Sequence, residues 1–423
     1  MAREMKDSGI EWIGNIPVTW TLMRVKHFFN ISRGRVIPVT SLLSNGKYPV
    51  FSSQTENNGC FGYLNTFDYK GPSITWTTDG AKAGTVFFRD GKYNCTNVCG
   101  ILQLKTKFKN NSNLKFFTYA ISMVAEKNKR YDINGFKIMS NEMANIKFAY
   151  PCLKEQLLIA NLLDKKCSVI DSLTADIEKQ ISLLEDYKKS IITGAVTKGL
   201  NPNVEFKDSG IEWIGKIPKH WEITKIKNLG NARNGLTYSP SNLCDENSGT
   251  LVLRSSNIKN GKLSFDDNVF VNCLIKNNLK VKKGDILICS RNGSAKLIGK
   301  SALIDRDLNS SFGAFMMIFR SKLNTRYIKY ILESDVFKFN LSSYLTSTIN
   351  QLTNQNFSNM KIVFCNSEKE QKEIVDFLDK KCSEIDSLIS DKKEQLEKLA
   401  SYKQSMIYEY VTGKKEIPTQ EIA

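Results

Sequence analysis

The chain has 423 residues, which is enough for two or three domains that each bury their own core. Its formal net charge of +17 at pH 7 favours a polyanionic partner, and nucleic acid is the leading candidate. The sequence contains no apolar run long enough to span a membrane, and its N-terminus lacks the apolar core of a signal peptide. We therefore expect no membrane contact and a cytoplasmic location.

The first element is a short block that the chain repeats. The octapeptide DSGIEWIG at residues 7–14 returns unchanged at residues 208–215, an offset of 201 residues. Self-similarity at a fixed offset fixes the architecture before any local pattern is considered. The tryptophans Trp12, Trp20, Trp213 and Trp221 recur at equal spacing in the two copies, which favours a packing role over ligand chemistry.

A variable region follows, at about residues 30–150. Short β-rich runs such as GPSITWTT and GTVFF are bounded by glycine and asparagine turns, which indicates a twisted and largely antiparallel sheet. The segment at residues 113–127 is predicted to add a helix.

A helical block closes the first half, and this block is also repeated. EQLLIANLLDKKCSVIDSL at residues 155–173 returns as EQKEIVDFLDKKCSEIDSL at residues 370–388, now with an offset of 215. Apolar residues recur in a 3-4 pattern through Leu163, Ile170, Leu173, Ile177, Leu184, Tyr187 and Ile191, and the second block keeps the same register. Sustained heptads without proline or glycine predict long helices that pack as a coiled coil, each about 60 Å long.

The second variable region, at about residues 226–366, shares almost no letters with the first. Runs such as GTLVLRSS, GDILICS and GAFMMIFR again predict strands, and residues 324–341 predict a helix. The expected parts are therefore 1–152, the first frame block and variable domain; 153–200, the first helical arm; 201–366, the second frame block and variable domain; and 367–423, the second arm with a C-terminal tail.

The positive charge is confined to the variable regions. Residues 30–150 hold 16 Lys and Arg against 7 Asp and Glu, and residues 226–366 hold 19 against 9. The helical blocks at 153–200 and 367–415 are close to neutral, with 7 of each and 10 against 11. This partition is expected if the variable domains contact phosphates while the arms hold them in place.

Each variable domain also has polar loops whose residue types suit base edges. Arg pairs with guanine, Asn or Gln pairs with adenine, and a Thr methyl can meet the thymine methyl. In the first domain the candidates for DNA binding are Arg33, Arg35, Ser53, Gln54, Thr77, Thr78, Asp79, Gly80, Lys82, Asn134 and Lys137. In the second domain they are Arg233, Asn234, Thr237, Tyr238, Arg254, Ser255, Asn257, Ser290, Arg291, Asn292, Ser294, Lys296, Asn350, Gln351, Thr353, Asn354 and Gln355. Each loop taken alone could be no more than a turn.

Catalytic and metal sites are not expected. Ten cysteines are scattered without a C-x-x-C pair and only two histidines are present, whereas a zinc site needs four closely arranged ligands. We interpret the cysteines as reduced, small apolar residues. GSAKLIGKS at residues 293–301 resembles a phosphate-binding loop, but it has five residues between its glycines instead of four and a strand pattern follows. The [DN]-P-P-[FYW] signature of amino-methyltransferases is also absent from the sequence.

The paired order of the blocks resembles a known family. GIEWIG-x-IP opens each half, and EQ-x-x-I-x-x-x-L-D-x-K with a later ID-x-L closes it. This pattern is similar to the specificity subunit of type I restriction–modification systems, which are prokaryotic, and it covers essentially the whole chain.

The resemblance implies an α+β fold with two globular target recognition domains separated by two long helices that pack as an antiparallel coiled coil, with a pseudo-twofold internal repeat. Each domain is expected to read one half of a split double-stranded DNA target. The helices are expected to set the gap and to dock two methyltransferase subunits, and restriction subunits with translocase and nuclease activity would join the complex. S-adenosylmethionine, ATP and Mg²⁺ would belong to those partner subunits, with no cofactor in this chain and no catalysis by it.

Two other hypotheses stay open at the level of sequence. One is a standalone nuclease or methyltransferase with an unrecognised catalytic motif, and the other is a structural adaptor that contacts only protein.

Overall fold

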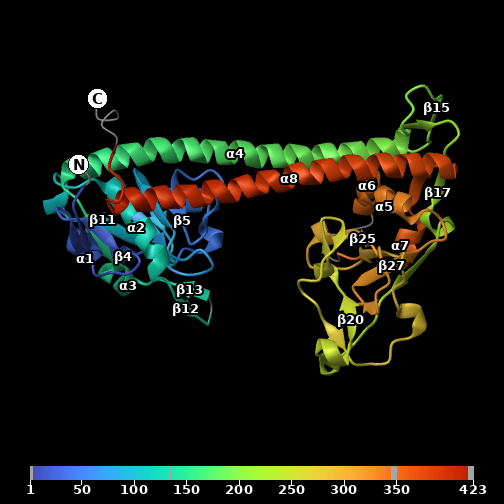
Figure 1. The fold of residues 1–423 in the computed structure, drawn as a ribbon, viewed down its shortest axis with the longest axis horizontal. Coiled ribbons are helices and arrows are strands. Elements are labelled where there is room, and N and C mark those ends of the chain that lie inside the picture. The colour runs from blue at the N-terminus through green and yellow to red at the C-terminus, as the bar shows by residue number, and fades with distance from the viewer. Residues whose placement is uncertain (1–2, 134, 344–349, 418–423) are drawn as a thin grey trace. The chain divides into compact units, whose positions relative to one another are not determined.

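The computed structural model describes residues 3–133, 135–343 and 350–417 (Figure 1). The chain divides into two compact units: unit 1 is Met1–Ile177 with Lys393–Ala423, and unit 2 is Glu178–Lys392. Two long helices, α4 (Leu153–Lys198) and α8 (Glu368–Val411), contribute one segment to each unit. The predicted helical blocks are therefore confirmed. The four part boundaries drawn from the sequence remain a prediction.

Unit 1 contains two four-stranded sheets. The first has the order β4-β11-β8-β9 and is antiparallel throughout, and the second has the order β6-β5-β10-β7 with β5 and β10 parallel. The strands of these sheets are β4 (Phe29–Arg33), β5 (Tyr48–Phe51), β6 (Cys60–Leu64), β7 (Tyr69–Lys70), β8 (Ser73–Thr77), β9 (Val86–Arg89), β10 (Lys92–Cys95) and β11 (Cys99–Leu104).

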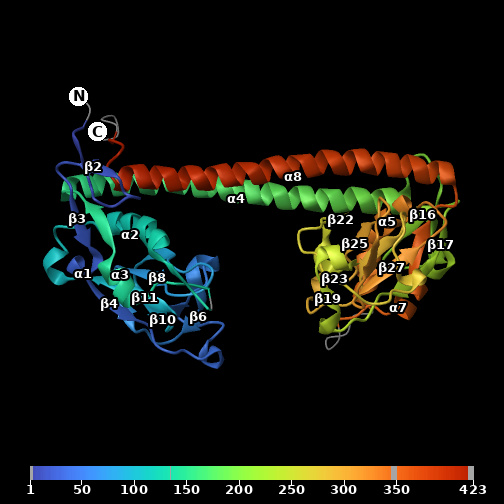
Figure 2. The same cartoon turned by 60° about the horizontal axis from the view of Figure 1, so that its bottom comes forward.

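Shorter elements complete unit 1. Three two-stranded pairs are formed by β1 with β2, β3 with β14, and β12 with β13. The elements are β1 (Met5–Asp7), β2 (Asn15–Pro17), β3 (Thr21–Arg24), α1 (Val25–Phe28), α2 (Leu114–Asn128), β12 (Arg130–Asp132), β13 (Gly135–Lys137), α3 (Ser140–Asn145) and β14 (Lys147–Tyr150). Helix α2 confirms the helix predicted at residues 113–127, and Figure 2 shows it beside the long helices of unit 1.

Unit 2 repeats the strand order of the first sheet although its variable region shares almost no letters with the first, and its second sheet carries the fourth strand at the opposite edge. Its sheets have the orders β18-β27-β24-β25 and β19-β23-β20-β26, and β20 and β26 pair in parallel. The strands are β18 (Asn231–Asn234), β19 (Leu243–Cys244), β20 (Thr250–Leu253), β23 (Phe270–Val271), β24 (Ile286–Cys289), β25 (Ser301–Leu303), β26 (Ser310–Phe312) and β27 (Met316–Arg320). The prediction of largely antiparallel sheets is confirmed in both units. Strand β25 also follows the glycine-rich segment that only resembled a phosphate loop.

The remaining elements of unit 2 include one correction. A single helix was predicted at residues 324–341, but Ser334 interrupts it because its side chain accepts a hydrogen bond from the Phe337 N–H and starts a second helix. The elements are β15 (Phe206–Asp208), β16 (Lys216–Pro218), β17 (Glu222–Lys225), β21 (Ile258–Lys259), β22 (Lys262–Leu263), α5 (Thr325–Glu333), α6 (Asp335–Ser342), α7 (Asn354–Asn359) and β28 (Lys361–Phe364).

The identical octapeptides form identical turns. In the first copy the Asp7 carboxylate accepts a hydrogen bond from the Gly9 N–H at 3.0 Å, and the Ser8 hydroxyl accepts one from the Ile10 N–H at 3.2 Å. The same two bonds recur in the second copy. Short polar side chains of this kind stabilise turns by bonding to backbone groups two residues ahead.

Each turn is attached to the start of a long helix by a buried tryptophan. The Trp20 indole donates to Glu155 on α4 at 3.0 Å, and the Trp221 indole donates to Glu370 on α8 at 3.1 Å. Both indoles are fully buried, which confirms the predicted packing role for these two tryptophans. Glu370 also accepts from Cys365, and His220 Nε2 lies 2.8 Å from it.

The long helices run antiparallel in each unit, since the first part of α4 lies with the last part of α8 in unit 1 (Figure 1). The predicted heptad positions are partly wrong, however. Leu163, Ile170 and Ile177 are buried as expected, but Leu173 is 45% exposed and Tyr187 is 57% exposed. The buried positions instead include Cys167, four residues after Leu163 and three before Ile170, and its counterpart Cys382. The apolar spacing is therefore 4 then 3, whereas the predicted pattern placed Leu173 three residues after Ile170.

An equivalent lysine–aspartate ion pair joins the two long helices in each unit. The Lys403 ammonium lies 2.5 Å from Asp171 in unit 1, and the Lys188 ammonium lies 2.6 Å from Asp386 in unit 2. These four residues are related by the offset of 215 seen in the sequence. A polar pair at a single layer of a helix seam selects one register over its neighbours.

The variable domains dock on the helices through a second repeated contact. The Tyr119 hydroxyl on α2 donates to Asp164 on α4 at 2.9 Å, and the Tyr330 hydroxyl on α5 donates to Asp379 on α8 at 2.7 Å. Burial raises the pKa of both phenols, so both stay protonated donors across the neutral range.

We predict that Glu370→Ala lowers the free energy of unfolding by about 1–3 kcal/mol, because the buried Trp221 N–H loses its acceptor. Burial alone would raise the pKa of Glu370, but hydrogen bonds involving His220, Cys365 and Trp221 outweigh it and hold the pKa below its ordinary 4.5. A carboxyl whose pKa is lowered on folding stabilises the protein above that value and loses the effect as the pH falls through it. The deficit of the variant, measured by urea unfolding, should therefore stay constant from pH 7 to about pH 5 and shrink as the pH falls below 4.5. The exposed Glu373→Ala is the matched control, and equal losses for the two variants would contradict the prediction.

Candidate nucleic-acid interface

The polar loops predicted from the sequence lie in pairs. In unit 2 the loop after β24 pairs with a segment about sixty residues further on: Arg291 is bridged to Gln351, and the Leu352 N–H donates to the Ser290 carbonyl at 2.7 Å. In unit 1 the loop after β8 pairs with β13, where Asp79 is bridged to Lys137. The expectation that both domains place such loops at corresponding positions is confirmed, and their contact with DNA stays a prediction.

In unit 2 these loops line a cleft with a volume of about 1160 Å³, here called the unit 2 cleft. Its walls are Leu236, Thr237, Tyr238, Arg254, Ser255, Ser256, Asp267, Arg291, Asn292, Gly293, Gly313, Ala314, Phe315, Met316, Asn350 and Gln351. Eight of these were candidates from the sequence, drawn from four separate stretches of the chain: Thr237, Tyr238, Arg254, Ser255, Arg291, Asn292, Asn350 and Gln351.

The cleft holds two arginines in different settings. Arg254 Nη2 lies 2.8 Å from the Asp267 carboxylate, while its buried Nε has no hydrogen-bond partner among the described residues. The Arg291 guanidinium sits 5.1 Å from the centre of the Phe315 ring, and that ring is 58% exposed. A cation over an exposed aromatic face is held without losing its N–H donors. The cleft therefore presents hydrogen-bond donors to whatever enters it.

Other candidates in unit 2 have structural roles. Asn257 is fully buried, and its side chain donates to the Ser264 and Asp267 carbonyls while accepting from the Arg254 N–H. The Thr353 hydroxyl caps α7 by accepting from the Asn356 N–H at 3.1 Å. Residue type suggested base contacts for both, but burial and local hydrogen bonds occupy their polar groups.

The rest of the unit 2 candidates lie outside the cleft. Ser290 is buried at the end of β24, and Arg233, Asn234, Ser294, Lys296 and Gln355 are exposed. The Arg233 guanidinium donates to the Asn278 carbonyl at 3.2 Å. Asn354 begins α7 and is half-buried.

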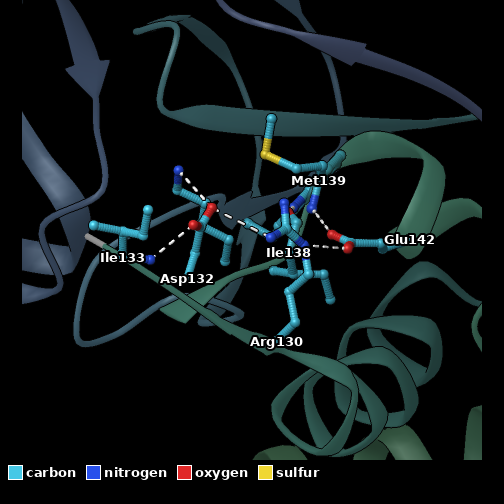
Figure 3. Close-up of polar contacts among 8 residues, drawn as sticks. Arg130, Asp132, Ile133, Ile138, Met139 and Glu142 are labelled. Atoms are coloured by element: carbon cyan, nitrogen blue, oxygen red, sulfur yellow. Dashed lines mark hydrogen bonds and ion pairs between the residues drawn. The ribbon is translucent and has the colours of Figure 1, made fainter. Parts of the chain in front are cut away.

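In unit 1 the counterpart segment is the β12–β13 hairpin, which an ionic network braces (Figure 3). Arg130 lies 2.6 Å from Glu142 and 3.2 Å from Asp132, and Lys137 lies 3.0 Å from the same aspartate. The hydrogen bond from Lys137, followed by one from the Ile133 N–H, lowers the pKa of Asp132. The Met139 N–H donates to Glu142 at 2.6 Å, so the same carboxylate also starts helix α3.

The hairpin carries apolar side chains that the sequence analysis did not select. Tyr131 is 76% exposed, Ile133 is 95% exposed and Phe136 is 37% exposed. The signal that could have found them is the NG dipeptide at residues 134–135, a sequence pattern typical of hairpins, which has apolar residues on either side. Asn134, one of the candidates, lies outside the described residues.

The other unit 1 candidates divide into exposed groups and groups that hold the loop. Thr77 and Thr78 are buried, and the Thr77 hydroxyl donates to the Lys82 carbonyl at 2.6 Å. Gly80 adopts φ +98°, a conformation that favours glycine, and its N–H donates to the Phe136 carbonyl. Lys82 is exposed and Asp79 is half-exposed.

The last unit 1 candidates lie on neighbouring segments. Arg35 forms an ion pair with Asp68 at 2.8 Å, and Arg33 donates to the Asn97 carbonyl at 2.5 Å. Gln54 donates to the Cys60 carbonyl, and Ser53 is half-exposed in the same loop.

Arg89, which was not among the candidates, supports the loop that carries Ser53 and Gln54. Its guanidinium is 3% exposed, lies 3.6 Å from the Phe51 ring centre and donates to the Asn58 carbonyl at 2.8 Å. Burial lowers the pKa of Arg89 to about 10. A basic residue in a basic domain gave no signal that it would be buried.

The described part of the chain has neither a metal-binding cluster nor a helix suited to span a membrane. Within residues 3–133, 135–343 and 350–417, no cluster of His, Cys, Asp and Glu side chains could hold a metal ion. No helix in the same ranges combines the length and the apolar character that a membrane span requires.

The geometry defines an internally duplicated chain in which each unit carries a cationic variable domain with paired polar loops. A family model described as the type I restriction modification DNA specificity domain matches residues 17–183 and again residues 218–398. The chain belongs to this family, and it is a type I specificity subunit with two DNA specificity domains. The two matches begin 201 residues apart and end 215 residues apart, which are the two offsets of the repeated blocks.

Individual relatives agree with this assignment. The chain is 28% identical over 417 residues to the specificity subunit of the type I restriction enzyme MjaVIII from Methanocaldococcus jannaschii, which covers 94% of this chain and 93% of the relative. It is 42% identical over 144 residues to a Mycoplasma pneumoniae protein named as the N-terminus of a type I specificity subunit, covering 33% of this chain and 74% of that one.

A solved structure shares the fold. It comes from work titled as the structural basis of complex assembly and conformational transition of the type I R-M system, and the TM-score is 0.65 with 94% of this chain and 98% of that chain covered. The sequence identity is 13%, so the likeness concerns the fold. The α+β fold with two long helices and an internal repeat is therefore confirmed.

We predict that Asn257→Ala lowers the free energy of unfolding by about 1–3 kcal/mol, because the buried Asn257 side chain bonds to three backbone groups that the variant leaves without this partner. Arg291→Ala removes an exposed side chain and should change the free energy of unfolding by less than about 0.5 kcal/mol. Thermal or urea unfolding of the two variants checks this difference. A large loss for Arg291→Ala would mean that Arg291 maintains the fold of the cleft.

Proposed function

We propose that this chain recognises a bipartite DNA target, with the variable domain of each unit reading one half. The observation that carries the proposal is the recurrence of the same paired loops in both units, with different side chains on them. The excess of positive charge lies in the variable domains, where it would be attracted to phosphates. Unlike side chains on a repeated frame suit a target whose two halves differ in sequence.

The long helices would set the gap between the half-sites and dock two methyltransferase subunits. Support comes from apolar side chains that face away from the seam at repeated positions. Leu173 recurs as Leu388, which is 49% exposed, and Tyr187 recurs as Tyr402, which is 57% exposed. Leu173 and Tyr402 belong to unit 1, and the other two belong to unit 2. Two equivalent apolar surfaces are what two copies of one partner require.

The chain itself would not be an enzyme. S-adenosylmethionine would belong to the methyltransferase subunits, and ATP and Mg²⁺ to restriction subunits, with the complex acting on DNA in the prokaryotic cytoplasm. The rival function is a standalone nuclease or methyltransferase. Cleavage of plasmid with Mg²⁺, or transfer of methyl groups from S-adenosylmethionine, by the isolated chain would favour that rival.

We predict that the chain, assembled with its methyltransferase subunits, enriches two short motifs at a constant separation from a random duplex library. The physical reason is that one rigid frame would carry both reading domains. Sequencing of the bound duplexes measures the motifs. Enrichment of one contiguous motif, or of no motif, would contradict the bipartite target, and weak dependence of binding on salt would favour a protein-only adaptor.

We predict that Leu173→Asp combined with Tyr402→Ser leaves one methyltransferase subunit bound instead of two. The substitutions place charge and polarity on one of the two proposed docking surfaces and leave the other unchanged. Mass measurement of the assembled complex gives the number of subunits. Leu157→Asp is the control, because Leu157 is 42% exposed on the same helix while its repeat counterpart is Lys372. Retention of two subunits by the double variant would contradict the proposed docking surface.

A further inference from the structure

Backbone hydrogen bonds establish which positions of the two variable domains correspond. The Gly34 N–H donates to the Cys99 carbonyl in unit 1, and the Gly235 N–H donates to the Met316 carbonyl in unit 2. The N–H of Thr78 donates to the Val98 carbonyl, and that of Ser290 donates to the Phe315 carbonyl.

The paired segments obey the same correspondence. The Ile138 N–H donates to the Thr78 carbonyl at 2.9 Å, and the Leu352 N–H donates to the Ser290 carbonyl at 2.7 Å. The next residue of each loop is Asp79 in unit 1 and Arg291 in unit 2. Asp79 forms a β-bridge with Lys137, which precedes the donor Ile138, and Arg291 forms one with Gln351, which precedes the donor Leu352. Asp79 and Arg291 therefore occupy one position of a shared frame, although sequence alignment alone would not pair them.

The chemistry at this shared position is opposite in the two units. An ionised aspartate offers only hydrogen-bond acceptors, whereas an arginine offers five N–H donors in a fixed planar fork. In the major groove, guanine presents the acceptors O6 and N7, and cytosine presents the N4 amino donor. The two side chains are thus complementary to different bases.

Arg291 is placed to use its fork. Its side chain lies over Phe315 and lines the unit 2 cleft beside Asn350 and Gln351. The carboxylate in this cleft, Asp267, is paired with Arg254 instead. Across the described residues no ion pair or side-chain hydrogen bond occupies the Arg291 guanidinium. The equivalent of Phe315 in unit 1 is the aliphatic Val98, so this support exists only where the position carries a cation.

Asp79 is placed to use its carboxylate. Its Oδ2 accepts from the Thr78 hydroxyl at 3.0 Å, and Thr78 is buried, which fixes the orientation of the group. The neighbouring cation, Lys137, is paired with Asp132 in the hairpin network. Within the described residues no cation forms an ion pair with Asp79, although residues 30–150 hold more than twice as many basic as acidic residues. Such a carboxylate repels phosphates and is suited to a base donor.

We propose that Asp79 and Arg291 are specificity-determining residues of opposite preference: Arg291 donates to O6 and N7 of a guanine in one half-site, and Asp79 accepts from N4 of a cytosine in the other. This inference rests on the proposed function, since it assigns base identities to the two halves of the bipartite target.

The test uses the full chain assembled with its methyltransferase subunits and a random duplex library. Wild type should enrich a G·C base pair in each half, which Arg291 would read through the guanine and Asp79 through the cytosine. Arg291→Gln should lower the preference for that guanine by about 10- to 100-fold and favour adenine, which Gln can bind through N6 and N7. Asp79→Asn should lower the preference for the cytosine by a similar factor and leave the base preferences of the other half-site unchanged. Arg291→Lys should keep affinity and weaken the guanine preference, because the fork is lost while the charge remains.

Lys296→Ala and Lys82→Ala are matched controls on the same loops, and both should weaken binding without changing any base preference. If wild type enriches a two-part motif but the Arg291 and Asp79 variants leave every base preference unchanged, this inference is overturned and the proposed function stands. If a single variant alters both halves, the residue maintains the frame and the assignment is also overturned. If wild type enriches no two-part motif, the proposed function and this inference fail together.

Discussion

The hydrogen bond from a buried tryptophan to the glutamate at the start of a long helix is the constraint on which the rest of each unit depends. It joins a frame block to a helix that begins about 135 residues later in unit 1 and about 149 residues later in unit 2. The variable domain is the chain between these two anchors. Because both of its ends are held by the same contact, its interior can change while its attachment stays constant. The tyrosine–aspartate bonds from α2 and α5 then orient each domain on its helix.

The frame of each domain is maintained by backbone hydrogen bonds, which place few demands on side chains. This explains how two regions with almost no letters in common have the same strand order in their first sheet and the same paired loops. Side chains at equivalent positions are then free to differ in charge, as Asp79 and Arg291 do.

Much of this organisation could be predicted from the sequence. The repeats located the frame, and the absence of proline and glycine located α4 and α8 to within a few residues, because helix signals are local. The seam was less certain, since Leu173 and Tyr187 are apolar and fit a heptad although they face away from the partner helix. The cleft could not be predicted, because Gln351 lies beside Arg291 only after the sheet has formed. Residue type alone also failed to separate Asn257, which is buried and bonded, from Asn292, which lines the cleft.

The composition of the unit 1 core has a consequence for biosynthesis. Ile13, Ile16 and Trp20 near the beginning of the chain share one apolar cluster with Met406, Tyr410 and Val411 near its end. Unit 2, by contrast, is built from one continuous stretch. During synthesis, unit 2 can therefore close as soon as its last segment emerges from the ribosome, whereas Ile13, Ile16 and Trp20 share their cluster with Met406, Tyr410 and Val411 only after the final turns of α8 appear. The core of unit 1 therefore needs a later part of the chain than the core of unit 2 does.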